Sequence, residues 1–148
     1  MHMKIIIVSG YWNPIHIGHI AYLREAKKLG DYLIVIVNND NQVKLKGSVP
    51  FMNEKERVEI VKAIRYVDEV ILSDDIDKTV CYTIGIIKYC YFDDEVFFVK
   101  GGDRDINNIP EKDTCNRLNI KMIFGVGGGK TQSSSTLIKN SRRKRENN

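Results

Sequence analysis

Short apolar runs alternate with longer segments of helical period along the chain, and this alternation constrains the fold more than any other feature of the sequence. The apolar runs are rich in β-branched residues and largely uninterrupted, which is typical of strands buried on both faces of a sheet. They cover residues 4–10, 31–38, 67–73, 95–102 and 120–129. Because right-handed crossovers return the chain to the same direction, the pattern predicts an α/β fold, with a five-stranded parallel sheet and helices on both of its faces.

The segments between these runs carry helix start and stop signals. Gly30 follows one apolar stripe as a stop signal, and Asn53 precedes another as an N-cap. The predicted helices cover residues 18–29, 53–65 and 79–89, a segment that begins at Pro110 and a segment that begins at Ser133. Residues 38–50 are predicted to form a polar loop.

Length and composition predict one soluble domain. The chain has 148 residues, of which 43% are hydrophobic and 28% charged, close to the averages of globular domains. The apolar runs are too short to cross a bilayer and no leader with a cleavage site opens the chain, so we expect a cytoplasmic protein. The predicted organisation is a domain over residues 1–140, followed by a basic, disordered tail over residues 141–148.

The positive charge is concentrated in that tail. Of the net charge of +4, the last eight residues contribute +3, from four basic side chains and one acidic side chain. The preceding residues carry only about +1. A nearly neutral body predicts neither a nucleic-acid partner nor a membrane partner.

The chain contains three cysteines, Cys81, Cys90 and Cys115. An odd number without close metal-type spacing indicates reduced, mostly buried thiols. We therefore predict no disulfide and no metal site built from protein ligands.

Glycine, lysine, histidine and serine gather in the segments that follow the predicted strands. These segments are GYWNPIHIGH (10–19), NNDNQVKLKG (38–47), KGGDRD (100–105) and GGGKTQSSST (127–136). In open parallel sheets, ligands bind beyond the carboxyl ends of the strands, where the strand order reverses. The four segments are therefore predicted to form one binding site.

The first two segments have the chemistry of a phosphate site. His16 and His19 bracket Gly18 at a helix entry, where unpaired N–H groups and the helix dipole favour an anion. Each imidazole adds a donor, and either Lys44 or Lys46 supplies a mobile positive charge.

A second anion site is predicted where glycines precede Lys130 and serines open the last helix. It is not a P-loop, because Phe124 stands where that motif requires glycine. Two such sites facing one crevice would hold a triphosphate at both ends.

The tetrapeptide HIGH (16–19) matches the HxGH signature of the nucleotidyltransferase superfamily, and its flanks resemble the cytidylyltransferase branch of that superfamily. RYVDEVI (65–71) is similar to glycerol-3-phosphate cytidylyltransferases, and KTQSSST (130–136) lies over the branch's RTEGIST motif. NPIH (13–16) instead resembles nicotinate-mononucleotide adenylyltransferases. KLKG (44–47) and FVKGGD (98–103) also resemble heptose-phosphate adenylyltransferases.

The resemblance implies a Rossmann-like domain and an enzyme that transfers a nucleoside monophosphate to a phosphorylated acceptor with release of pyrophosphate. The leading prediction is transfer of CMP from CTP to a small phosphorylated alcohol such as glycerol 3-phosphate. The alternatives are an adenylyltransferase acting on a sugar phosphate or mononucleotide, and a nucleotide-binding module without turnover. The resemblance also implies Mg²⁺ held by phosphate oxygens and water, and a homodimer with residues 65–71 near its interface.

The resemblance assigns roles residue by residue. The catalytic residues would be His16, His19, Lys46, Arg57 and Lys130. The nucleotide-binding residues would be Gly10, Tyr11, Trp12, Gly18, Gly102, Asp103, Lys130, Thr131, Ser135 and Thr136. Asp40 and Lys44 would bind the acceptor. Each assignment also has a structural alternative. Arg57 could pair with a neighbouring carboxylate, Trp12 could be a packing residue, and the serines after Lys130 could be an ordinary helix N-cap.

Overall fold

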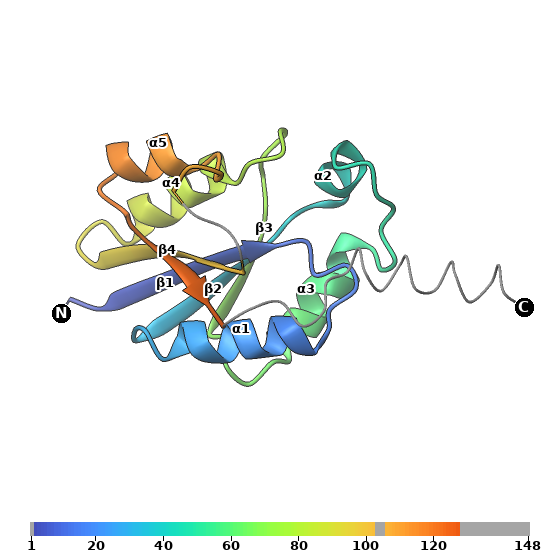
Figure 1. Ribbon diagram of the computed structural model, residues 1–148, viewed down its shortest axis with the longest axis horizontal. Helices are drawn as coiled ribbons and strands as arrows, with labels where there is room; N and C mark the ends of the chain where they lie inside the picture. The colour runs from blue at the N-terminus through green and yellow to red at the C-terminus, as the bar shows by residue number, and fades with distance from the viewer. Residues whose placement is uncertain (1, 103–105, 128–148) are drawn as a thin grey trace, which may run out of the picture.

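A computed structural model describes residues 2–102 and 106–127 and contains one parallel sheet of five strands in the order β3-β2-β1-β4-β5. The strands are β1 (Lys4–Gly10), β2 (Tyr32–Val37), β3 (Glu69–Leu72), β4 (Glu95–Gly101) and β5 (Lys121–Val126). The helices are α1 (Ile17–Lys27), α2 (Asp40–Leu45), α3 (Glu54–Lys62), α4 (Cys81–Cys90) and α5 (Lys112–Arg117). The predicted α/β fold is confirmed (Figure 1).

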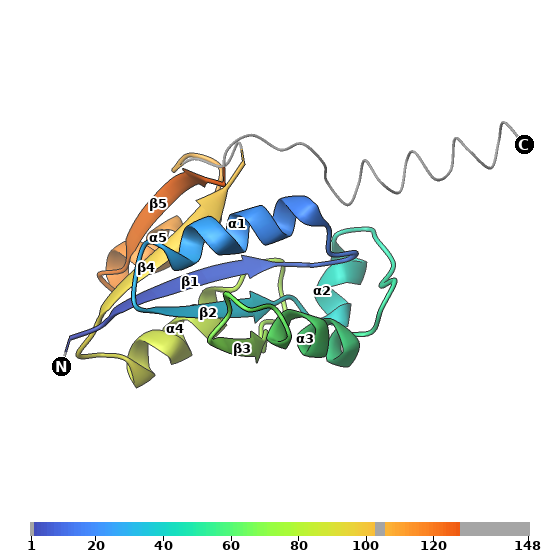
Figure 2. The ribbon, with the colours of Figure 1, turned by 90° about the horizontal axis from the view of Figure 1, so that it is seen from below.

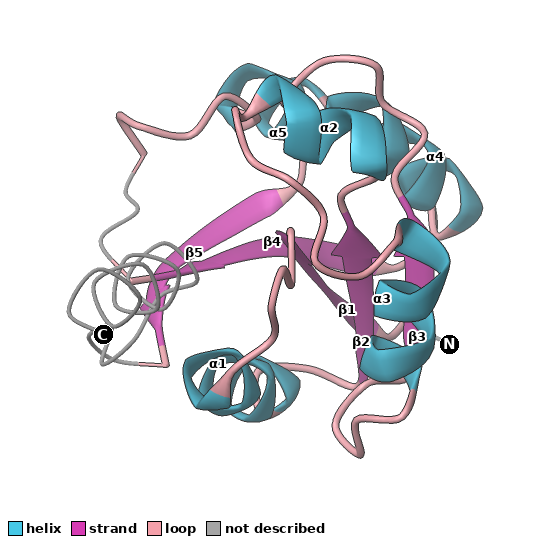
Figure 3. Ribbon diagram, turned by 90° about the vertical axis from the view of Figure 1, so that its right-hand side faces the viewer, coloured by secondary structure: helices cyan, strands magenta, loops and turns pink. Residues whose placement is uncertain are grey.

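Helices cover both faces of the sheet, with α1 and α3 on one side and α4 and α5 on the other (Figures 2 and 3). Alternate residues of β1 enter the two resulting cores. Ile5 and Ile7 pack in the core under α4 and α5, whereas Ile6 and Val8 pack in the core under α1. Burial on both faces explains why the strand sequences are continuous apolar runs.

The predicted polar loop over residues 38–50 is wrong in part, because α2 forms inside it. Asn39 and Gln42 make a capping box, in which each side chain accepts a hydrogen bond from the other residue's backbone N–H. The amide of Gln42 is buried and donates to the carbonyls of Asp77 and Thr79, both at 2.8 Å. These contacts fix the chain just beyond the carboxyl end of β2.

Other sequence predictions are met less closely. The helix expected to begin at Pro110 begins at Lys112, one half-turn later. The helix predicted from Ser133 and the tail predicted over residues 141–148 lie outside the described residues. Across the described part of the chain, none of the helices is long and apolar enough to cross a membrane.

The cysteines are free thiols, as predicted, but only Cys115 is buried. Burial, with a contribution from the nearby Glu111 carboxylate, raises the pKa of the Cys115 thiol to about 12. This thiol therefore stays protonated and is no nucleophile. Cys90 is exposed at the end of α4, contrary to the expected burial.

Candidate active site

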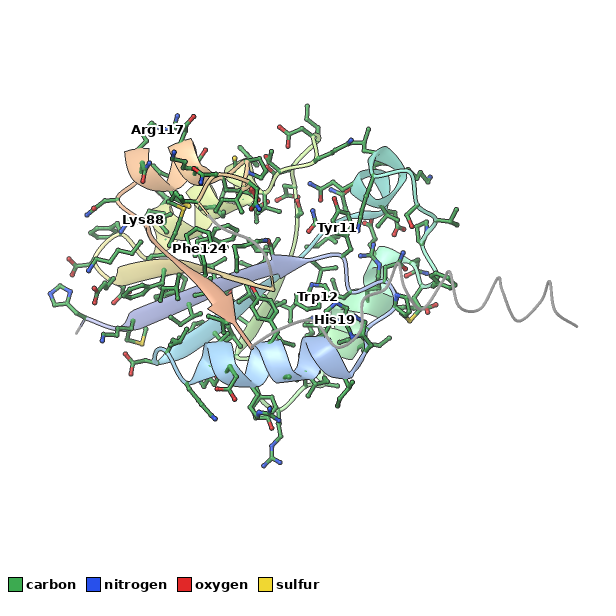
Figure 4. All side chains as sticks on the ribbon, in the orientation of Figure 1. Tyr11, Trp12, His19, Lys88, Arg117 and Phe124 are labelled. Carbon is green, nitrogen blue, oxygen red and sulfur yellow. The ribbon has the colours of Figure 1, made fainter. Side chains whose placement is uncertain are left out.

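The strand order reverses between β1 and β4, which are neighbours in the sheet although two strands, β2 and β3, lie between them in the chain. The connections that leave two such strands run to opposite faces and leave a crevice at the carboxyl edge. Tyr11, Trp12 and His19 lie beyond the carboxyl end of β1, at this edge (Figure 4). The site predicted from the sequence is therefore built around the loop that joins β1 to α1.

His16 and His19 open α1 as a reciprocal capping pair. The Nδ1 atom of His16 accepts a hydrogen bond from the backbone N–H of Gly18 at 3.1 Å. The backbone N–H of His16 donates to the Nδ1 atom of His19, also at 3.1 Å. The two imidazoles thus form a capping box, a role usually filled by serine or threonine and glutamate. Their rings stack with centroids 3.9 Å apart.

These hydrogen bonds decide which ring nitrogen carries hydrogen. A nitrogen that accepts from a backbone N–H uses its lone pair, so each neutral imidazole carries its hydrogen on Nε2. Both histidines therefore carry an Nε2–H donor group. They do so at the start of an eleven-residue helix, where unpaired N–H groups and the dipole also favour an anion. The stacked pair has the chemistry to bind one phosphate through two donors.

Trp12 packs beneath this pair. Its side chain is 2% exposed, and its indole N–H donates to the carbonyl of Ile36 in β2 at 3.2 Å. The indole meets the His19 ring edge-on, with centroids 4.9 Å apart. The predicted nucleotide contact of Trp12 would need exposed indole surface, which the structure does not offer. The side chain supports His19 instead.

A column of four rings continues from the histidines into the protein. The Tyr22 ring stacks on Trp12, with centroids 6.4 Å apart, and its hydroxyl donates to the carbonyl of Val99 in β4. Burial raises the pKa of the Tyr22 hydroxyl, which keeps it protonated as a donor. The column His16–His19–Trp12–Tyr22 therefore ties the two histidines to the central strands.

The absence of a side chain on Gly10 makes room for the indole of Trp12. A Cβ atom on Gly10 would lie 2.9 Å from the indole carbons, closer than a non-bonded contact permits. Trp12 itself has φ of 52°, in the left-handed region that bulky residues rarely adopt. Gly10, predicted to bind nucleotide, has a packing requirement of its own.

Replacing Trp12 tests the ring column. Trp12→Ala should lower the free energy of unfolding by about 3–5 kcal/mol, because it empties a buried indole site. Trp12→Phe keeps a ring but leaves the Ile36 carbonyl without its donor, and should cost about 1–3 kcal/mol. Urea unfolding followed by circular dichroism gives both values. A Trp12→Ala variant as stable as the parent would contradict the supporting role.

Arg57, predicted to be catalytic, is buried and makes contacts to four residues of the protein. Its side chain is fully buried, and Nη2 lies 2.7 Å from Oδ1 of Asp40. The remaining contacts are to backbone carbonyls of three different segments: Nε donates to Met52, and Nη1 to Tyr11 and Asn38. The guanidinium therefore fastens the loops after β1 and β2 to the start of α3. Burial and these four partners give Arg57 a structural role that competes with the substrate contact predicted for it.

Asp40 is held by the same cluster. Its carboxylate accepts from Arg57 and, at 3.2 Å, from the backbone N–H of Glu54. The Glu54 carboxylate in turn accepts from the backbone N–H of Asp40 at 3.0 Å. Asp40 thus joins α2 to α3, a role that competes with the acceptor contact predicted for it.

Of the two lysines left open by the sequence, Lys46 is the one placed at the histidine loop. Its Nζ atom lies 4.3 Å from the ring centroid of Tyr11, the residue that follows β1. Lys44 is exposed on α2. The structure brings Lys46 and Tyr11 together, and both stay predicted ligands of the substrate.

Lys100 and Ser9 were not singled out from the sequence. They stand near the carboxyl ends of β4 and β1, at the point of strand reversal, with Nζ of Lys100 donating to Oγ of Ser9 at 3.2 Å. Lys100 also lies 5.2 Å from the ring centroid of Phe98. The FVKGGD segment placed Lys100 at the site, but nothing in its sequence distinguished this lysine from a solvated one.

Asp103, Lys130, Thr131, Ser135 and Thr136 lie outside the described residues, and their assignments stay predictions. Gly102 is described and has φ of 62°, a conformation that suits glycine at the end of β4.

Mg²⁺ is predicted to bind at this site through phosphate oxygens and water. Within residues 2–102 and 106–127, no three His, Cys, Asp or Glu side chains are grouped to hold a metal ion. An ion bound to triphosphate oxygens and water needs few protein ligands. The described residues are compatible with that kind of binding and offer no protein cage.

A parallel α/β sheet with an anion-binding helix start at its point of strand reversal defines a nucleotide-binding class of protein. A family profile described as cytidylyltransferase-like matches residues 7–141. The chain belongs to this family, and the resemblance to nucleotidyltransferases is confirmed.

Similar proteins include two archaeal FAD synthases. That of Ferroglobus placidus is 48% identical over 75 residues, covering 51% of this chain and 49% of the relative. That of Thermoplasma acidophilum is 44% identical over 80 residues, covering 53% of this chain and 56% of the relative. The chain thus spans about half the length of the curated relatives it matches. Among solved structures, a lipopolysaccharide core biosynthesis protein from Thermoplasma volcanium has 26% identity and a TM-score of 0.66, covering 82% of this chain and 95% of that one.

Proposed function

We propose that this protein is a nucleotidyltransferase that joins a nucleoside monophosphate to a phosphorylated acceptor and releases pyrophosphate. The observation that carries the proposal is the stacked pair of His16 and His19, whose Nδ1 atoms accept backbone hydrogen bonds. That arrangement places the ring hydrogens on Nε2, and the proposed role of these N–H groups is to donate to phosphate. Family membership supports the same reaction class.

In the proposed reaction, an oxygen of the acceptor phosphate attacks the α-phosphorus of the nucleoside triphosphate in line. A new P–O bond forms, the bond to the bridging oxygen of the β-phosphate breaks, and pyrophosphate leaves with the electron pair. Negative charge grows on the α-phosphate oxygens and on the bridging oxygen. His16 and His19 stabilise this charge, and Lys46 adds a positive charge from the neighbouring loop.

The far end of the triphosphate is proposed to lie against Lys130, Ser135 and Thr136, with Asp103 and Thr131 nearby. Mg²⁺ bound to the phosphate oxygens would reduce their mutual repulsion. These roles follow from the sequence resemblance alone. A homodimeric, cytoplasmic enzyme is proposed on the same ground.

For the donor and acceptor, we favour adenylyl transfer from ATP to a mononucleotide of the FMN kind. Supporting this choice, the relatives that are 44–48% identical over half the chain are named FAD synthase. FAD is AMP joined to FMN, so such an enzyme is an adenylyltransferase. The second candidate is CMP transfer from CTP to glycerol 3-phosphate, which the RYVDEVI segment (65–71) favours.

A substrate panel separates these candidates. Purified protein is incubated with ATP or CTP and with FMN, glycerol 3-phosphate or a heptose phosphate, and pyrophosphate release is followed. We expect release from ATP with FMN, together with FAD identified by chromatography. Release only from CTP with glycerol 3-phosphate would establish the second candidate. No release from any pair would favour the remaining alternative, a nucleotide-binding module without turnover.

Lys100 is proposed to contact a substrate phosphate from the β4 side of the crevice. Lys100→Met should lower kcat/KM by about 10- to 100-fold, the effect of losing one charge-assisted hydrogen bond. The matched control is Lys121→Met. Lys121 also lies over a phenylalanine of β4, with Nζ 5.6 Å from the Phe97 centroid. It is the first residue of β5, however, and so lies at the amino end of the strand, away from the site. Equal effects of the two substitutions would contradict a role for Lys100.

A further inference from the structure

Helix α4 is apolar on the side that faces away from the sheet. Its inner face is formed by Ile84 and Ile87, which are buried in the core. Its outer face carries Tyr82, Ile86 and Tyr89, at the i, i+4 and i+7 positions of one helical stripe. A surface helix ordinarily places polar residues on the side away from the core. α4 departs from that pattern.

The outer stripe is large and carries no charge. Tyr82, Tyr89 and the following Phe92 are 63%, 83% and 77% exposed. A complete aromatic side chain has a surface of about 150–250 Å², so these three partly exposed side chains present on the order of 450 Å² of surface to solvent. Lys88 is the one charged residue between Cys81 and Phe92, and its Nζ atom reaches toward the carbonyl of Asp94 at 3.5 Å.

Gly85 stands in the middle of the same stripe, where a glycine weakens a helix relative to alanine. A Cβ atom at this position would meet no atom of the described residues within 4 Å. Packing within the described chain therefore does not require the glycine. Its missing side chain leaves room for a group that approaches from outside.

The stripe has a symmetry that suits a second copy of itself. Tyr82, Gly85, Ile86 and Tyr89 are arranged symmetrically about the point between Gly85 and Ile86. When two such helices cross antiparallel about a two-fold axis at that point, Tyr82 faces the second copy's Tyr89, and the gap at Gly85 faces the second copy's Ile86. Self-complementarity of this kind is what a two-fold interface requires.

We propose that the outer face of α4, centred on Gly85 and Ile86, is a contact surface for a second copy of this chain. The aromatic area offers more than half of the ~800 Å² per partner of a standard interface, and Ile86 enlarges it. Tyrosine and phenylalanine without charge at the centre are typical of such surfaces. The surface differs from the segment 65–71, which the family resemblance placed near a dimer interface.

Sedimentation velocity over a range of protein concentrations tests the proposal. The parent chain should form a dimer that dissociates on dilution. Ile86→Glu should raise the dimer dissociation constant at least about a hundredfold, because it buries unpaired charge at the two-fold axis. The matched control is Ile60→Glu on α3, where the isoleucine is 36% exposed compared with 39% for Ile86; it should leave the constant unchanged.

A second variant separates folding from association. Gly85→Ala should raise the melting temperature of the dilute, monomeric protein, because alanine favours the helix. It should also weaken the dimer about tenfold by filling the gap that receives Ile86. A chain that stays monomeric at every concentration overturns the proposal, as does a dimer that keeps its dissociation constant in both Ile86→Glu and Gly85→Ala.

Discussion

Substituting His16 by asparagine should lower turnover by about a hundredfold to a thousandfold while leaving nucleotide affinity within a few-fold of the parent value. Asparagine is a good N-cap, so its side-chain oxygen can accept from the Gly18 N–H as Nδ1 does now. The variant therefore keeps the cap of α1 and loses the Nε2–H donor together with the ring that stacks on His19. Transient kinetics and equilibrium titration with the nucleotide give the two quantities.

The matched comparison is His16→Ala, which loses both the cap and the donor. It should show the same loss of turnover and a further loss of about 0.5–2 kcal/mol in the free energy of unfolding. If asparagine restored turnover along with stability, His16 would be only a helix cap. If affinity and turnover fell equally, the donor would act in binding rather than in the transition state.

Much of this site could be predicted because its signals are local. The strands follow from continuous apolar runs, and the place of His16 and His19 follows from a strand ending directly before a helix start. α2 was missed although Asn39 and Gln42 have the spacing of a capping box. A short helix without an apolar stripe gives little periodic signal.

The parts that could not be predicted depend on contacts between distant segments. Nothing near Trp12 in the sequence shows that its indole reaches the Ile36 carbonyl of another strand, so an exposed and a buried tryptophan were equally compatible with the loop. Lys100 gains its place only because β4 pairs with β1, which brings it to Ser9. The order of the strands, and not their existence, is what the sequence pattern leaves open.

The contacts of Arg57 also come from distant segments of the chain, and replacing this residue should have a large effect on stability. Arg57→Met should lower the free energy of unfolding by about 3–5 kcal/mol, because Asp40 would lose its buried charge partner. The carbonyls of Tyr11 and Asn38, which belong to the two loops beside the site, would lose their donor as well. Urea unfolding should show this loss, and the Michaelis constant for the nucleotide should rise because both loops loosen.

Two comparisons separate this structural role from direct contact with substrate. Arg24→Met removes an exposed arginine paired with Glu25 at 3.4 Å, and should change the free energy of unfolding by no more than about 0.5 kcal/mol. Arg57→Lys keeps the charge but cannot reach four acceptors from one planar group, so it should be destabilised nearly as much as Arg57→Met. A stable Arg57→Lys variant with turnover reduced a hundredfold would instead place Arg57 on the substrate. The four contacts of the guanidinium lead us to expect the first outcome, in which stability falls and the chemical step survives in the molecules that remain folded.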